Sequence, residues 1–327
     1  QWVTLPLALH GTVVKKDGTV IDINIGEADT DPVFCVTDLL PHLAQEQMEK
    51  KGARVVEGED LNILIGNSPV EGAEKEAVKA NVIKLLKDKY NIDEEDFISA
   101  EIEAIPAGKA REAGLDRSMI ISYGQDDRVC AYTSLKAMLE TEKSEKTACC
   151  LLVDKEEIGS VGATGMQSRF FENTVAELMA LTGEYSELGL RRALRNSRML
   201  SSDVSSAYDP AYASAFEKKN AAFLSHGIVF NKFTGARGKS GSNDANAEYI
   251  ADLRNILDSN DVHFQTAELG RVDLGGGGTI AYILALYGME VIDSGVAVLS
   301  MHAPWEVTSK ADIYEAEKCY KAFIKNA

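Results

Sequence analysis

The chain has 327 residues, 45% of them hydrophobic, and its 51 acidic against 34 basic side chains give a formal net charge of −17. This length predicts one large or two ordinary domains with a substantial core. The acidic balance disfavours nucleic acid, whose phosphates need basic surfaces. No apolar stretch is long enough for a membrane span and no secretory signal is visible, so we expect neither a nucleic acid nor a membrane partner.

The first part of the chain, residues 1–105, predicts a smaller β-rich domain. Asp17-Gly18 lies between two β-branched runs, which is a strong hairpin signal. Further on, apolar residues recur at helical spacing among charged ones, as in a helix with a solvated face. The elements predicted here are strands at 11–16 and 19–25, a capped helix start at 37–44 with a Pro in its first turn, extended backbone at 55–65, and a helix that begins near Glu74.

A loop with Pro and Gly at 106–114 marks the expected domain junction, so the second domain is assigned to residues 106–327. Predicted strands alternate with predicted helices there. This alternation favours an α/β fold in which a mixed β-sheet is sandwiched by helices. The predicted helices cover 129–139, 171–181, 187–195, 245–257, 279–287 and 311–324, and the predicted strands or extended segments cover 148–153, 198–202, 262–266 and 291–299.

The five cysteines are odd in number and none belongs to a Cys-x-x-Cys motif. Cys149 and Cys150 are neighbours on a predicted strand, where their side chains point to opposite faces. This usage indicates reduced, buried thiols, and we expect a cytoplasmic protein.

Glu156 and Glu157 follow the apolar run 147–153, which predicts a buried strand, and they precede a turn with Gly. The end of a strand is the usual place for chemistry in an α/β sheet. Burying two adjacent carboxylates is unfavourable unless cations pair with them. The pair therefore indicates either a metal site or a solvated turn.

Three further motifs bring acidic or histidine side chains to predicted strand ends or loops. Each alone has a plainer interpretation, because paired aspartates commonly form turns or helix caps, and a single Asp or His usually serves the structure. Together they supply oxygen and nitrogen ligands without a thiolate at ligand spacing, which fits Zn²⁺, Mn²⁺ or Co²⁺ in a hydrolytic site. The motifs are Asp126-Asp127, Ser201-Ser-Asp203 and Met301-His302-Ala-Pro-Trp-Glu306.

With these motifs the sequence resembles the M18 family of metalloaminopeptidases, which includes aspartyl aminopeptidase and vacuolar aminopeptidase I. The resemblance covers nearly the whole chain and keeps the order of the family's motifs. It rests on Glu156-Glu157-Ile-Gly-Ser160, Ser201-Ser-Asp203, Gly275-Gly-Gly-Gly-Thr279 and Met301-His302-Ala-Pro-Trp-Glu306, and residues 34–44 resemble the family's dimerisation domain. It implies a dimerisation domain at 1–105 and a metallopeptidase catalytic domain at 106–327.

The resemblance implies two divalent metal ions, zinc foremost, with manganese or cobalt as alternatives. Asp126 would bridge both ions. Glu157 and His302 would complete one site, and Asp203 would bind the other ion. Asp127 would support this arrangement and follow Asp126 through a cis peptide bond.

Glu156 would be the general base of a di-metal aminopeptidase that removes the N-terminal residue of peptides through a metal-bridging hydroxide. Because neighbours in a strand point apart, Glu157 could face a metal while Glu156 reaches a water. The alternatives are a non-catalytic assembly subunit on the same scaffold and a glycoside hydrolase. Adjacent glutamates argue against the glycoside hydrolase, since they cannot readily flank one bond from opposite faces.

One departure from the family concerns a further ligand that it takes from an early His-x-Asp motif. No histidine here is followed by Asp two residues later; the five are His10, His42, His226, His263 and His302. Since the sequence opens without Met and reads like the interior of a domain, we expect this ligand upstream of Gln1. The alternative is an inactive protein.

The resemblance places Gly277, Gly278 and Thr279 in a turn that lines the substrate pocket. The residues alone also allow a phosphate-binding turn or a backbone turn with positive φ. The Gly run lacks the Lys of a P-loop and the spacing of a complete GxGxxG motif.

Lys232, together with Arg237 and Lys239, belongs to a basic loop that could attract an acidic side chain of the substrate. A solvated loop is the alternative, and the choice between an acidic and a broader substrate preference stays open. The expected partners are peptides with a free N-terminus and further copies of the chain. The resemblance implies a homo-oligomer, a dodecamer built from dimers.

Overall fold

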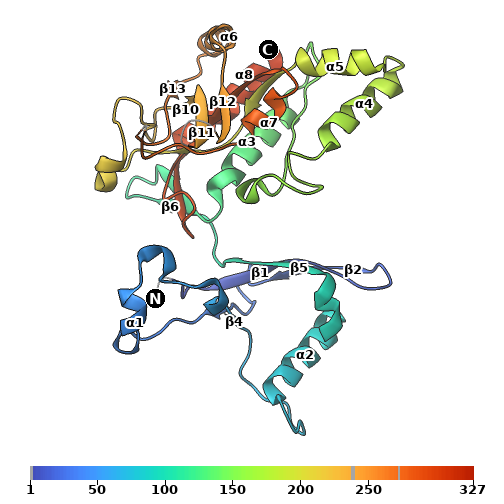
Figure 1. Cartoon of the computed structure of the whole chain (residues 1–327), viewed down its shortest axis with the longest axis vertical. Coiled ribbons are helices and arrows are strands. Elements are labelled where there is room, and N and C mark those ends of the chain that lie inside the picture. The colour runs from blue at the N-terminus through green and yellow to red at the C-terminus, as the bar shows by residue number, and fades with distance from the viewer. Residues whose placement is uncertain (1–2, 237–239, 272) are drawn as a thin grey trace. The chain divides into compact units, whose positions relative to one another are not determined.

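The computed structural model describes residues 3–236, 240–271 and 273–327, and the chain divides into two compact units between Lys109 and Ala110 (Figure 1). The division falls inside the segment 106–114, where the expected loop is limited to the residues between β5 (Ala100–Pro106) and β6 (Arg111–Ala113). Each unit has a hydrophobic core of its own.

In unit 1 the described residues form a sheet with the strand order β2–β1–β5. Its strands are β1 (Leu7–Val14), β2 (Val20–Ile25) and β5 (Ala100–Pro106), and helix α2 covers Ala77–Tyr90. The backbone N–H of Thr19 donates to Oδ1 of Asp17 at 2.9 Å within the β1–β2 turn. The predicted hairpin and the predicted helix after Glu74 are therefore confirmed.

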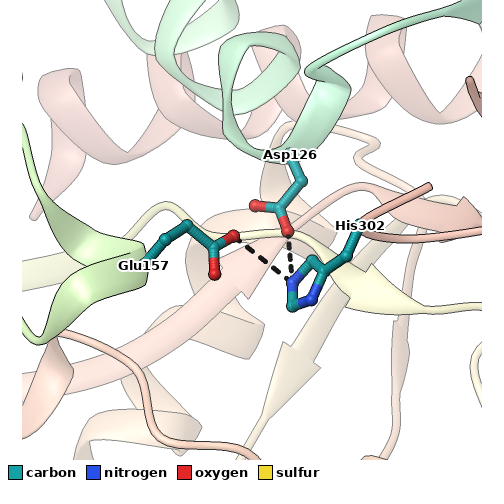
Figure 2. A group of neighbouring side chains, drawn as sticks. All are labelled: Asp126, Glu157 and His302. Carbon is teal, nitrogen blue, oxygen red and sulfur yellow. Dashed lines mark ion pairs between the residues drawn. The ribbon is translucent and has the colours of Figure 1, made fainter. Parts of the chain in front are cut away.

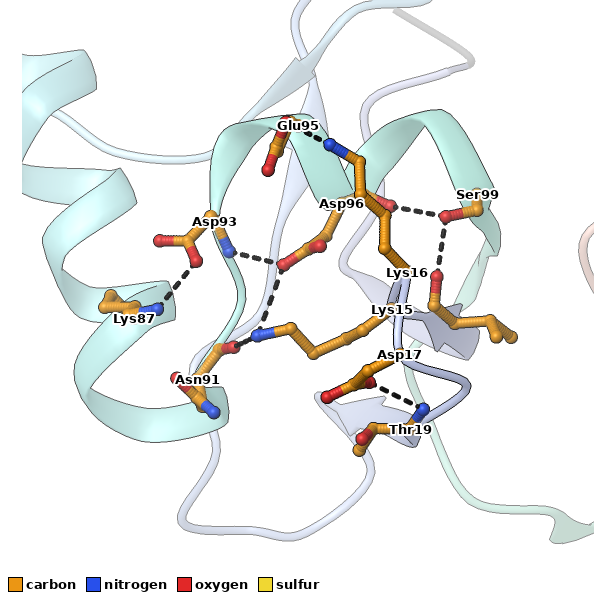
Figure 3. Close-up of polar contacts among 11 residues, drawn as sticks. Lys15, Lys16, Asp17, Thr19, Lys87, Asn91, Asp93, Glu95, Asp96 and Ser99 are labelled. Atoms are coloured by element: carbon orange, nitrogen blue, oxygen red, sulfur yellow. Dashed lines mark hydrogen bonds and ion pairs between the residues drawn. The ribbon is translucent and has the colours of Figure 1, made fainter.

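A network of polar contacts joins this hairpin to the C-terminal end of α2 and to the 3₁₀ helix η4 (Glu94–Ser99) (Figure 3). Nζ of Lys15 donates to the carbonyl of Asn91 at 2.6 Å and lies 3.6 Å from Oδ2 of Asp96. The same Oδ2 accepts the N–H of Asp93 at 2.9 Å. The side chains of Lys15 and Asp96 are only 17% and 7% exposed, so this contact is shielded from water.

We expect Lys15→Met to lower the free energy of unfolding by about 1–3 kcal/mol, because it removes a charged donor and leaves the Asp96 carboxylate without its cation. Urea denaturation of the full chain, read together with hydrogen exchange of the β1 amides, measures the effect. Lys16→Met is the matched control, since Lys16 pairs with Glu95 in full solvent at 77% and 62% exposure, and it should change nothing measurable. Equal effects of the two variants would contradict the role given to Lys15.

Two other predictions for unit 1 are wrong in detail. Instead of a helix start across 37–44, Leu40 is extended, because the residue before a proline is kept out of the α region. Most of 55–65 is not a strand, since Gly58 opens a 3₁₀ turn there. The observed elements are η1 (Pro41–Leu43), α1 (Gln45–Glu49), η2 (Gly52–Arg54), η3 (Gly58–Asp60) and a short pair of strands, β3 (Cys35–Val36) with β4 (Ile63–Leu64).

The described residues of unit 2 form a mixed sheet in the order β13–β10–β14–β8, with β14 parallel to β8 and antiparallel to β10. A second sheet has the order β6–β7–β16–β15–β9, and β11 pairs with β12 as a hairpin. The strands of the first sheet are β8 (Arg198–Ser201), β10 (Ile228–Asn231), β13 (Phe264–Thr266) and β14 (Glu290–Gly295). The others are β6 (Arg111–Ala113), β7 (Met119–Ser122), β9 (Ser205–Ser206), β11 (Phe233–Ala236), β12 (Ser240–Asp244), β15 (Ala297–Leu299) and β16 (Glu306–Ser309).

Helices cover both faces of the first sheet (Figure 1). Adjacent residues of β14 show this, because side chains alternate between the faces of a strand. Ile292 packs in a core formed with α3, α6 and α8, whereas Val291 packs in a core formed with α4, α5 and α7. The helices are α3 (Gln125–Glu140), α4 (Phe170–Thr182), α5 (Glu187–Arg195), α6 (Ala247–Ser259), α7 (Ala281–Ala285) and α8 (Lys310–Asn326). The predicted α/β fold, a mixed sheet between helices, is confirmed.

The strand predicted at 147–153 is wrong. This segment pairs with no strand in the described part of the chain. It lines one side of a cavity of about 540 Å³, which is also lined by Met199 and Leu200 of β8. The apolar run therefore gains no ladder hydrogen bonds, and Leu152 remains 54% exposed. Within the described ranges every helix is too short or too polar to cross a lipid bilayer.

Candidate metal centre

The candidate ligands of unit 2 lie in turns at the ends of regular elements. Asp126 and Asp127 open α3 after Gly124, which has a φ of 59°. Both aspartates have non-helical backbone angles, and the peptide bond between them is cis, as expected.

Glu156 and Glu157 lie in the 3₁₀ turn η5 (Glu156–Ile158) rather than at the end of a strand. The turn is bounded by Lys155 with a φ of 67° and Gly159 with a φ of 97°, so the chain reverses there. The expectation that the two glutamates alternate as in a strand is therefore wrong. Both side chains nevertheless line the 540 Å³ cavity, together with Asp126, Asp127 and Asp203.

Asp203 follows β8, and His302 lies in the turn between β15 and β16 with a φ of 63°. Nε2 of His302 lies 3.0 Å from Oδ2 of Asp126 and 3.3 Å from Oε1 of Glu157, so three distant segments converge (Figure 2).

Two groups of potential ligand atoms share Asp126. One consists of Asp126, Glu157 and His302, and the other of Asp126, Asp127 and Asp203. In each group the ligand atoms lie within 4.8 Å of one another. The structure thus brings together every candidate ligand named from the sequence, and it adds Asp127 as a possible ligand of the second group.

Burial and mutual repulsion raise the pKa values of the aspartates in these two groups. Burial, then the charge of Glu157, raises the pKa of Asp126 to about 6, and His302 opposes this rise. Burial followed by Asp126 holds the pKa of Asp203 well above its usual range, and burial followed by Asp203 does the same for Asp127. Carboxylate oxygens and an imidazole nitrogen, gathered around the partly buried Asp126 with an excess of negative charge, are a donor set that suits divalent cations.

Asp293 on β14 is a buried acid that the sequence analysis missed. It lies opposite Ser201 on β8, only 2% exposed, and its two carboxylate oxygens have no hydrogen-bond partner among the described residues. Burial raises the pKa of Asp293 to about 7, and the hydroxyls of Thr279, Ser201 and Thr234, which lie near the carboxyl without forming well-placed hydrogen bonds, act in the opposite direction. In the sequence this strand shows only an apolar pattern. Asp293 could have been found only as the one acidic side chain that interrupts the apolar run.

This pKa predicts how stability depends on pH. The carboxyl of Asp293 ionises near pH 3.8 in the unfolded chain and only near pH 7 in the folded chain. Between these two pH values the folded chain keeps a proton on this carboxyl that the unfolded chain has lost. The wild type should therefore lose stability relative to Asp293→Asn, on the order of a few kcal/mol, as pH rises from 4 to 7, with little change above that. Urea denaturation of both proteins across this range, in chelator, measures the difference. Parallel pH profiles would contradict it.

The candidate substrate residues lie outside the two ligand groups. Thr279 lies beside Asp293, and the carbonyl of Gly277 accepts the N–H of Gly235 at 2.9 Å, so this turn contacts the β11–β12 hairpin. Lys232 is half exposed and pairs with Asp244. The basic candidates Arg237 and Lys239 lie outside the described residues.

Comparison with known proteins identifies the family of this chain and agrees with its fold. Residues 1–324 match the family described as aminopeptidase I zinc metalloprotease (M18). A probable M18 family aminopeptidase 1 of Clostridium acetobutylicum is 66% identical over 327 residues, which are 100% of this chain and 70% of the relative. A homologue of the same description from Thermotoga maritima is 46% identical over 99% of this chain and 72% of its own length.

Solved structures agree. The crystal structure of aminopeptidase I from Clostridium acetobutylicum superposes with a TM-score of 0.93 at 64% identity, covering 100% of this chain and 71% of that one. The M18 aminopeptidase from Thermotoga maritima gives a TM-score of 0.96 at 46% identity, covering 100% and 72%. The protein is therefore a metallopeptidase in class. It belongs to the M18 family of aminopeptidases.

Proposed function

We propose that this aminopeptidase binds two divalent ions, zinc foremost with manganese or cobalt as alternatives, at the two groups that share Asp126. The observation that carries the proposal is that one carboxylate belongs to both groups. Glu157 and His302 would belong to one site, and Asp203 with Asp127 would contribute to the other. Asp126 would then bridge the ions.

When bound, such ions supply Lewis acidity, which lowers the pKa of water and polarises a peptide carbonyl. Glu156 would accept the proton of the attacking water and pass it to the leaving amine. Its location supports this role, because Glu156 lines the same cavity as Asp126 and Glu157. Burial, followed by the charge of Glu157, raises the pKa of Glu156, which makes its carboxylate a stronger base.

We propose peptides with a free N-terminus as substrates. The excess of carboxylates around Asp126 favours a substrate ammonium, and that contact would restrict cleavage to the first peptide bond. Gly277, Gly278 and Thr279 would line the pocket for the substrate. Lys232 is the described candidate for attracting an acidic first side chain, but Asp244 already pairs with it, which favours a broader preference.

We further propose a homo-oligomer, a dodecamer built from dimers. Exposed apolar side chains of unit 1 support an interface there, among them Leu40, Leu43 and Met48 at 54%, 73% and 72% exposure. A yeast mApe1 dodecamer shares the fold at 19% identity and a TM-score of 0.69. A reducing compartment, the cytoplasm, is proposed because all five cysteines are free thiols; the expectation that they are buried holds only for Cys130 and Cys319, and Cys149 is exposed.

The experiment compares unblocked with N-acetylated peptides, before and after dialysis against a chelator, with the bound metal measured by elemental analysis. We expect cleavage of unblocked peptides alone, loss of activity in chelator, and recovery when zinc is restored at two ions per chain. Cleavage of blocked peptides, or activity that is indifferent to chelation, would refute the proposal. Metal binding without activity would favour the non-catalytic assembly subunit.

A further inference from the structure

A buried glutamate connects two of the turns that carry candidate ligands. Glu306, the first residue of β16, is 2% exposed. Its Oε2 accepts the backbone N–H of Asp126 at 3.0 Å, and its Oε1 accepts the backbone N–H of His302 at 2.8 Å. One carboxylate therefore bridges the start of α3 and the β15–β16 turn through their main chains.

The backbone of Glu306 is itself held in place. Nε2 of Gln125 donates to the carbonyl of Glu306 at 2.8 Å and to the carbonyl of Ile120 at 3.0 Å. The hydroxyl of Thr308, a fully buried residue, donates to Oε1 of Gln125. In the sheet, Glu306 lies opposite Ser122 of β7. The main chain of Glu306 is thus fixed independently of its carboxylate, by the side chain of Gln125 and by pairing with β7.

We infer that Glu306 is a positioning residue that sets the separation of Asp126 and His302, so that both side chains reach the same metal ion. The inference rests on the proposed metal site. Nε2 of His302 lies 3.0 Å from Oδ2 of Asp126, and this geometry depends on two turns that are far apart in sequence. Groups that orient metal ligands typically change metal affinity by about 10–100-fold when they are removed.

The competing explanation is that Glu306 only stabilises the fold, as any buried carboxylate with two N–H partners would. The chain offers a matched control in Asp312, near the start of α8. Asp312 is 0% exposed, and its two oxygens accept the N–H groups of Ser225 at 2.7 Å and Gly227 at 2.8 Å. It has the same chemistry as Glu306 but holds a turn outside both ligand groups.

The experiment compares Glu306→Gln and Asp312→Asn with the wild type, in the full chain. Each amide presents an NH₂ group to one backbone N–H, so each variant loses one of two hydrogen bonds at nearly constant volume. Zinc affinity is measured by competition with a chromophoric chelator, and thermal unfolding is recorded without metal. We expect both variants to unfold at lower temperature, and Glu306→Gln alone to bind zinc about 10–100-fold more weakly.

The inference is wrong if Glu306→Gln binds zinc with wild-type affinity. It is also wrong if Glu306→Gln and Asp312→Asn lose the same amount of zinc affinity, because the loss would then follow from lower stability of the fold. If Glu306→Gln does not fold, Glu306→Asp serves instead. It keeps the charge but is one methylene too short to reach both N–H groups, and we expect the same weakening. A wild type that binds no zinc would refute the proposed metal site and this inference together. A wild type that binds zinc as tightly as Glu306→Gln does would refute only the inference.

Discussion

We expect Glu156→Gln to lower kcat for unblocked peptides by about 10²–10⁴-fold, the usual contribution of a general base, and to leave KM and the zinc content close to those of the wild type. The reason is that the amide has nearly the same shape as the carboxylate but cannot accept the proton of the attacking water. Glu156 lines the cavity beside Asp126 and is not a member of either ligand group, so its loss should spare the metal. Steady-state kinetics with elemental analysis of the same sample measures both quantities.

Glu315→Gln is a suitable control for this experiment. Glu315 is another buried glutamate of unit 2, and its Oε2 accepts the N–H of His263 at 2.8 Å. It belongs to neither ligand group, so kcat should be unchanged in this variant. If Glu156→Gln instead lost zinc in proportion to its activity, Glu156 would be a ligand and another group would have to be the base.

The second expected result is that Asp126→Asn removes both ions, whereas His302→Ala or Asp203→Asn removes one. Asp126 contributes to both ligand groups, and the other two residues contribute to one each. Asp126→Asn should weaken zinc binding by more than the roughly 10–100-fold expected when a group that only orients a metal ligand is removed. Peptidase activity should be lost together with the zinc. Zinc titration monitored by calorimetry gives the number of ions bound by each variant.

The folding of these variants needs a separate check, because Asp126 is partly buried. Removing its charge also relieves repulsion with Glu157, so Asp126→Asn should be as stable as the metal-free wild type or more stable. A variant that retains one tightly bound ion would show that the two groups do not share this ligand. The bridging role of Asp126 would then be wrong, even though the site would still bind metal.

The sequence predicted the helices and the α/β class because their signals are local. The apolar spacing of α6 and α8 and the Asp17-Gly18 turn depend on neighbours a few residues away. The predicted strand at 147–153 is wrong because a hydrophobic run does not specify a partner strand, and this segment instead lines a cavity together with residues of β8.

The candidate ligands were found because acidic and histidine side chains at strand ends are conspicuous among apolar runs, and because their order matched a family. The contacts that hold them were not found from the sequence. Glu306 accepts hydrogen bonds from backbone N–H groups, which any residue provides, so its role cannot be recognised from residue spacing. Asp293 is notable because its buried oxygens lack hydrogen-bond partners, which the sequence does not show either. Convergence of Asp126, Glu157 and His302 required the fold.

The strand order β2–β1–β5 has a consequence for how unit 1 folds. The β1–β2 hairpin closes a short loop, but β1 also pairs with β5, with Leu7 opposite Pro106. The second pairing must wait until the intervening chain has been ordered, and the entropy of closing so long a loop slows it. During synthesis β1 therefore emerges with one edge satisfied and the other open, and that edge is exposed to intermolecular pairing until residue 106 leaves the ribosome.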